Sequence, residues 1–107
     1  MRIFWSWQSW SPRKTNWYFI EDAIKKAIKN IKSDVTIDLV PVLDRATDNA
    51  FGAVDIADTI LEKIAECDVF ICDLTLVTSP DSLNQISNPN VLFELGYAAR
   101  HLDWSSI

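Results

Sequence analysis

Hydrophobic and polar positions along the chain form two kinds of pattern. Short apolar or alternating runs predict three strands, over Arg2–Trp7, Val35–Val42 and Val69–Leu74. Longer segments with apolar residues three and four positions apart predict three helices, over Asn16–Ile31, Val54–Glu66 and Pro89–His101. The resulting strand–helix alternation favours an α/β domain, with a parallel sheet and helices on both of its faces.

The patterns within the strands suggest their order in the sheet. Val35–Val42 alternates apolar and polar side chains and contains Pro41, which is typical of an edge strand. Val69–Leu74 is almost continuously apolar, as expected for a central strand. With right-handed crossovers, we expect a flavodoxin-like three-layer α/β/α fold whose strand order begins 2-1-3. Loops are predicted over Asp44–Ala53 and Thr75–Ser87, and Trp104–Ile107 can begin another strand.

Size and composition exclude several classes of protein. The 107 residues suffice for one domain, 1–107. A net charge of −5 with scattered basic residues argues against a nucleic-acid surface, and no apolar run is long enough for a membrane span. Two glycines exclude Rossmann and P-loop fingerprints, and one histidine without a paired-cysteine motif argues against a metal site. No leader precedes the first strand, so we expect a cytoplasmic protein.

The strand order predicts where a ligand would bind. In open parallel sheets, ligands bind beyond the carboxyl ends of the strands where the order reverses, here between the first and third strands. Asn90, Glu94, Tyr97 and His101 share a polar stripe of the third helix, at the margin of its buried face. Helical side chains lean toward the N-terminus, so Glu94 can point into this crevice. On geometry alone, an ordinary surface glutamate is the commoner interpretation.

Three segments carry a resemblance to a known family. The segment Asn-Pro-Asn-Val-Leu-Phe-Glu-Leu-Gly-Tyr-Ala at 88–98 resembles a signature of TIR-like domains and of the related nucleoside 2-deoxyribosyltransferase-like proteins. Phe-Trp-Ser-Trp-Gln-Ser at 4–9 and Cys-Asp-Val-Phe-Ile-Cys-Asp-Leu-Thr at 67–75 agree with it, with Asp44-Arg45 between them. Typical members continue through at least one more strand and helix. The resemblance therefore implies a single TIR-like domain that either is truncated or has its sheet completed by another chain.

The resemblance also implies a function. Bacterial TIR-like relatives hydrolyse NAD as effectors of antiphage immunity, and a linked or partner sensor activates them by driving self-association. The glutamate of the third-helix motif is catalytic in the family, which assigns that role to Glu94. Residues at the end of the first strand surround the nucleotide, and here the matching positions are Trp5, Ser6, Trp7 and Gln8. NAD is then a substrate, with no cofactor or metal expected.

The chemistry separates two enzymatic interpretations. Cleavage of a ribosyl C–N bond passes through an oxocarbenium-like state, which one carboxylate can stabilise or trap as an ester. The nicotinamide of NAD is cationic and leaves neutral, so it needs no proton donor. A deoxyribosyltransferase-like N-glycosidase acting on neutral bases wants one, and Asp73 or Asp44 can supply it. A non-enzymatic TIR-like interaction module is the third alternative.

The remaining candidate residues have two interpretations each. Asn90 can bind the ribose or orient Glu94, or it can be an ordinary residue at a helix start. Trp5 and Trp7 can stack on a base, although their alternation with apolar neighbours predicts that at least one is in the core. Asp44 and Arg45 can bind ribose or phosphate, or form a local surface ion pair. Asp73 can be a ligand or a loop cap.

Overall fold

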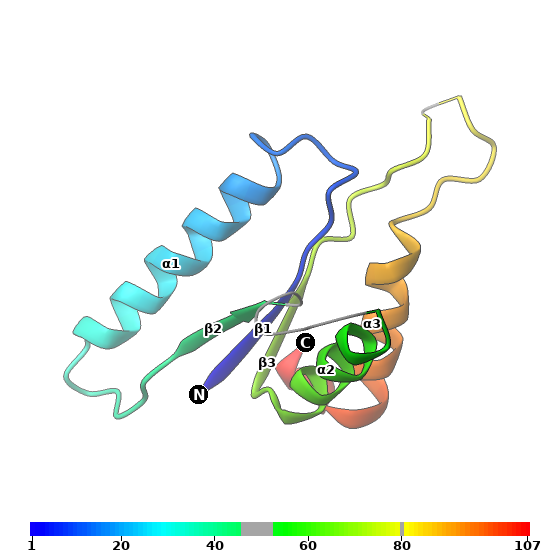
Figure 1. Cartoon of the computed structure of the whole chain (residues 1–107). Helices are drawn as coiled ribbons and strands as arrows, with labels where there is room; N and C mark the ends of the chain where they lie inside the picture. Colours follow the sequence, from blue (N-terminus) through cyan, green and yellow to red (C-terminus); the bar gives the residue numbers. More distant parts are fainter. Residues whose placement is uncertain (46–52, 80) are drawn as a thin grey trace.

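The computed structural model describes residues 1–45, 53–79 and 81–107, with only the backbone for residues 53–55. The described elements follow in the order β1 (Arg2–Ser6), α1 (Trp17–Ser33), β2 (Val42–Arg45), α2 (Ala53–Glu66), β3 (Val69–Cys72), α3 (Pro89–His101) and the 3-10 turn η1 (Trp104–Ser106). The strands form a parallel sheet of order β2-β1-β3. Helix α1 lies on one face, and α2 and α3 lie on the other (Figure 1). The predicted α/β class, flavodoxin-like layering and 2-1-3 order are confirmed.

Alternation along β1 divides the apolar side chains between the two faces. Phe4 is fully buried beneath α2 and α3, where its ring stacks on Phe70 of β3 at 5.8 Å and packs with Ile64 and Ala98. Trp5, the next residue, is also fully buried but stacks on Trp17 of α1, with ring centroids 5.8 Å apart. Because successive strand residues point to opposite faces, even-numbered positions of β1 face α2 and α3 and odd-numbered ones face α1.

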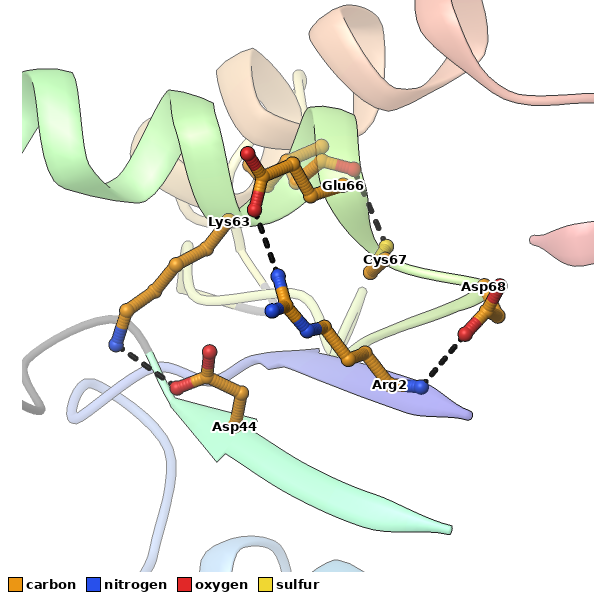
Figure 2. A network of polar contacts seen from close by, with 7 residues as sticks. Arg2, Asp44, Lys63, Glu66, Cys67 and Asp68 are labelled. Atoms are coloured by element: carbon orange, nitrogen blue, oxygen red, sulfur yellow. Dashed lines mark hydrogen bonds and ion pairs between the residues drawn. The ribbon is translucent and has the colours of Figure 1, made fainter. Parts of the chain in front are cut away.

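Polar contacts hold the end of α2 against β1 and β2 (Figure 2). Lys63 Nζ donates to Asp44 Oδ1 of β2 at 2.8 Å, and Arg2 Nη1 donates to Glu66 Oε2 at 2.6 Å. The backbone N–H of Arg2 donates to Asp68 Oδ2 at 2.7 Å, just before β3 begins. The first two contacts tie the end of α2 to β2 and β1, and the third joins β1 to the residue that precedes β3. Helix α2 is therefore positioned by charge as well as by the apolar core.

The second strand is shorter and later than predicted, and the prediction of a strand over Val35–Val42 was wrong for all but its last residue. Parallel pairing with β1 begins at the partners Arg2 and Val42. Residues 35–41 come before Val42, and Met1 is the only residue before β1 that can lie beside them. Val35 is accordingly fully exposed. The alternation predicted a half-buried strand, but a strand also needs a partner of the same length.

Two further predictions are corrected at the third strand and the C-terminal turn. Within the described residues β3 is paired on one side only, so the middle strand of the described sheet is β1 and not β3. Trp104–Ser106 forms a 3-10 turn and not the start of a strand. By contrast α3 has the predicted bounds, since Pro89 occupies its first turn and the Asn88 side chain accepts a hydrogen bond from the N–H of Asn90. None of the described helices combines the length and apolarity needed to cross a bilayer.

Candidate functional site

The sheet separates the sequence-predicted site residues into two groups. Ser6, Asn90 and Glu94 lie on the face covered by α2 and α3, and Glu94 comes within hydrogen-bond reach of the end of β1. Trp5, Trp7 and Arg45 lie on the opposite face beside α1. The single crevice expected from the sequence is thus two environments with the sheet between them.

Glu94 is held at the carboxyl end of the central strand. Val91 and Ala98 on the same helix are buried against the sheet and the core, which brings the neighbouring stripe of α3 toward β1. The Ser6 hydroxyl donates to Glu94 Oε2. Burial raises the pKa of Glu94, and the hydrogen bond from Ser6 partly offsets this by lowering it. Glu94 is therefore a partly desolvated carboxyl group with a fixed orientation.

A cavity of about 300 Å³ adjoins Glu94 between α2 and α3. Its wall is mostly apolar, and its polar members are Asn90 and Glu94 on α3. The lining side chains are Ile56, Ala57, Ile60, Leu61, Asn90, Phe93 and Glu94. The sequence predicted a pocket beside Glu94 but placed it between the first and third strands. The helix α2 wall was missed, because its apolar positions are the same ones that a core-facing stripe would use.

Asn90 stands one turn before Glu94 on α3 and contributes to the same cavity. Its backbone N–H is satisfied by Asn88 Oδ1 at 2.9 Å. Its side chain is exposed. Its side-chain amide can both donate and accept hydrogen bonds and contributes a polar group to an otherwise apolar wall.

Asp73 anchors the loop that follows β3. Its side chain is 6% exposed and accepts hydrogen bonds from the Thr75 hydroxyl at 2.6 Å, the Thr75 N–H at 3.0 Å and Asn16 Nδ2 at 3.4 Å. Burial alone would raise the pKa of Asp73, but hydrogen bonds from Thr75, Asn16 and Gln8 together lower it. Asp73 does not line the cavity, and its ionised carboxylate is part of the hydrogen-bond network of the loop after β3.

Gln8 belongs to this same loop network. Its side chain is 4% exposed, and Nε2 donates to the Thr75 carbonyl at 3.1 Å. Gln8 Oε1 is buried without a protein partner among the described residues. Gln8 therefore links the end of β1 to the loop after β3 and lies outside the cavity wall.

The predicted aromatic and charged residues of the other face form a packed layer. The Trp17 ring of α1 contacts both Trp5 and Trp7, with centroids 5.8 and 5.9 Å away. The guanidinium of Arg45 lies 5.9 Å from the Trp5 ring and 5.5 Å from the Trp17 ring, and pairs with Glu21. Asp44 pairs with Lys63 on the opposite face. Asp44 and Arg45 thus each pair with a different helix.

Cys72 is another described residue near Glu94 that sequence reasoning did not include among the site residues. It is the register partner of Ser6 in β3. Burial first, then the charges of Asp73 and Glu94, raise the pKa of its thiol. No motif marks this residue, and only its pairing with Ser6 across the sheet brings it near the carboxylate.

Comparison of the chain with models of known protein families, with curated proteins and with solved structures finds no match. The class of protein shown by the fold is a small α/β domain with a three-stranded parallel sheet of order 2-1-3.

Proposed function

We propose that the chain is a TIR-like NAD glycohydrolase in which Glu94 is the catalytic carboxylate. The observation that supports this most is a single oriented carboxylate at the wall of a mainly apolar cavity of about 300 Å³. A cavity of this size suits a planar ring with its attached ribose, while the remainder of a dinucleotide extends outside it. The resemblance of residues 88–98 to the TIR-like signature supplies the reaction class.

The reaction needs little from the protein besides this carboxylate. The C1′–N bond breaks, its electron pair goes to the nicotinamide nitrogen, and the pyridinium becomes neutral without taking a proton. Glu94 stabilises the positive charge that develops on the ribose. Water then adds to C1′ and one proton is released, which gives nicotinamide, ADP-ribose and H⁺. The apolar wall from α2 favours expulsion of a neutral ring into a dry environment and strengthens the carboxylate's electrostatic effect.

The alternative, a deoxyribosyltransferase-like enzyme acting on neutral bases, is less well supported by the same geometry. It wants a proton donor beside Glu94. Asp73 faces the loop network with a lowered pKa, and Asp44 pairs with Lys63 at 2.8 Å. Neither aspartate lines the cavity. A cationic leaving group therefore fits this site better than a neutral one.

The biological setting of the proposal comes from the resemblance. We infer an effector domain in bacterial antiphage immunity that self-associates when a linked or partner sensor is triggered. Activity is accordingly expected to be low in the isolated monomer and to increase when copies are brought together. The interaction-module alternative predicts assembly without any cleavage of NAD.

Nicotinamide release tests the proposal. The chain, alone and fused to a coiled coil that forces oligomerisation, is incubated with NAD, and nicotinamide is quantified by chromatography. Glu94→Gln is expected to reduce release by about 100-fold or more, because the carboxylate that stabilises the transition state is gone. Its fold should be at least as stable at neutral pH, since a buried charge has been removed.

Glu62→Gln is the matched control, since Glu62 is an exposed residue of α2 with the same chemistry. It should retain the parent rate. Equal release from the parent and Glu94→Gln oligomers would rule out the assigned role, and exchange of bases among deoxynucleosides would favour the alternative enzyme.

A further inference from the structure

The hydrogen bond between Ser6 of β1 and Glu94 of α3 suggests that these two residues have different roles at the site. Ser6 is the last residue of β1 and is fully buried, 88 positions from its partner Glu94. Its neighbours on the strand, Trp5 and Trp7, face α1, so the side chain of Ser6 alone among the three points toward α3. The family resemblance groups Ser6 with nucleotide-binding residues, but the structure directs its hydroxyl to the carboxylate.

We propose that Ser6 is a positioning residue for Glu94, which holds Oε2 of the carboxylate so that Oε1 is presented to the ribose anomeric carbon. This inference rests on the proposed function, because it assigns Ser6 a part in that reaction. Ser6 does not contact the reacting atoms itself.

The surroundings of Glu94 give this hydroxyl its importance. From α2 the neighbouring side chains are the apolar Ile56, Ala57, Ile60 and Leu61. From β3 the titratable group nearby is the Cys72 thiol, which Asp73 follows directly in the chain, and from α3 itself the polar neighbour is Asn90. None of the cations in the described residues forms an ion pair with Glu94. Ser6 is therefore the hydrogen-bond donor that the structure gives this carboxylate.

In the proposed reaction, a carboxylate that is already held in one orientation stabilises the transition state better than a mobile one. A glutamate side chain has several rotatable bonds, and ordering it costs free energy that must otherwise be supplied at each turnover. A buried serine at the end of a central strand imposes that order before substrate binds, because neither the strand nor the residue can move easily. The same hydrogen bond favours the ionised carboxylate against the effect of burial. Positioning and ionisation both depend on one hydroxyl.

Two readouts on Ser6→Ala test the proposal. In nicotinamide release by the forced oligomer, kcat is expected to fall by about 10-fold to 100-fold with little change in KM, because geometry and not substrate affinity is lost. The acidic limb of the pH–kcat profile should move to higher pH, since the charged form of Glu94 loses its donor. In the free protein, the ¹³C chemical shift of the Glu94 carboxyl should titrate at higher pH than in the parent chain.

Ser11→Ala is the matched control. Ser11 is also a buried serine whose hydroxyl donates a hydrogen bond to a carboxylate. Its partner, at 3.4 Å, is Asp73 in the loop network after β3 and not Glu94. It should leave the Glu94 titration and the acidic limb unchanged. Ser6→Cys preserves the size of the side chain with a weaker donor and should give intermediate values, and it replaces Ser6→Ala if thermal melts show that the alanine variant does not fold.

The outcomes separate this inference from the function on which it rests. An unchanged Glu94 titration midpoint and an unchanged kcat in folded Ser6→Ala and Ser6→Cys, with the parent active, would overturn the positioning role alone. Absence of nicotinamide release from every parent form would overturn the proposed function, and the catalytic part of this inference with it. The carboxyl titration would still measure the contact itself in that case.

Discussion

Two carboxyl groups near the carboxyl ends of β1 and β3 have pKa values displaced in opposite directions. For Glu94 the dominant cause is burial beside an apolar cavity, and its pKa is raised. For Asp73 burial is outweighed by a set of hydrogen-bond donors, and its pKa is lowered. The first group suits chemistry that exploits a poorly solvated charge, whereas the second suits a permanent structural anchor.

The consequence for Asp73 is a pH-dependent contribution to stability. Because its pKa is lower in the folded chain than in the unfolded one, its stabilisation is present above the unfolded value of about 3.9 and is lost as pH falls through the folded value. Asp73→Asn is expected to lower the free energy of unfolding by about 1–3 kcal/mol at pH 7. Urea denaturation at several pH values measures this.

The difference between Asp73→Asn and the parent should shrink as pH falls below about 4. Asp103→Asn serves as the control, since Asp103 is exposed and its side chain makes no capping hydrogen bond. A gap between parent and Asp73→Asn that is constant from pH 7 to pH 3 would contradict the assigned pKa direction.

For single residues, the sequence indicated which ones belong to the candidate site but not which of them contact one another. Glu94 and Ser6 were both predicted as site residues from the resemblance. Their contact was not predicted, because an interaction across 88 positions depends on how α3 packs on β1 and leaves no local pattern. Asp73 was left open between ligand and cap, and its bonds to Thr75 and Asn16 agree with the cap.

Among the elements, α3 was predicted from its own residues and β2 was not. The Asn88-Pro89 start of α3 is a local signal, since the cap and the first-turn proline act within three residues of each other. The bounds of β2 depend instead on where β1 begins, which alternation within 35–42 cannot reveal. The start of the helix that carries the candidate site is therefore encoded in neighbouring residues, whereas the bounds of the edge strand depend on its hydrogen-bonded partner β1.

The cap of α3 gives a prediction at the scale of the element. Asn88 is 4% exposed, and its Oδ1 accepts from the Asn90 N–H at 2.9 Å. Asn88→Ala should reduce stability by about 1 kcal/mol, equivalent to a fall of roughly 4–8 °C in Tm for a domain of this size. Differential scanning calorimetry measures the change.

Asn88→Asp keeps an acceptor at the same position and adds a charge that a helix N-terminus favours, so it should recover most of the loss. Equal Tm values for the parent and Asn88→Ala would show that the cap contributes nothing to the start of α3.

Across the whole molecule, charged pairs join the helical layers to the sheet from both sides. Glu21 of α1 pairs with Arg45 of β2. Lys63 of α2 pairs with Asp44, the preceding residue of β2 (Figure 2), so consecutive residues of β2 pair with helices on opposite faces of the sheet. The layers and strand order could be predicted from the sequence because they follow from element order and crossover handedness. The cavity between α2 and α3 could not, because it depends on how closely two helices approach over the sheet.

Two ion pairs made by described residues of α2 differ in burial and should differ in strength. Lys63 and Asp44 are 16% and 31% exposed, whereas Arg2 and Glu66 are 60% and 65% exposed. Lys63→Met is expected to cost about 1–3 kcal/mol, because it leaves a partly buried carboxylate without its cation. Arg2→Met should change stability by about 0.5 kcal/mol or less.

Urea denaturation of the two methionine variants, with the parent chain beside them, gives both values. Similar losses for Lys63→Met and Arg2→Met would show that burial does not distinguish these contacts.

The cavity beside Glu94 is built by two helices that contribute different things. Helix α3 brings the acidic group and Asn90, whereas Ile56, Ala57, Ile60 and Leu61 of α2 provide shape and an apolar environment. Exchanging the apolar residues of α2 is consequently expected to change the shape of the cavity while the contact between Ser6 of β1 and Glu94 of α3 stays in place.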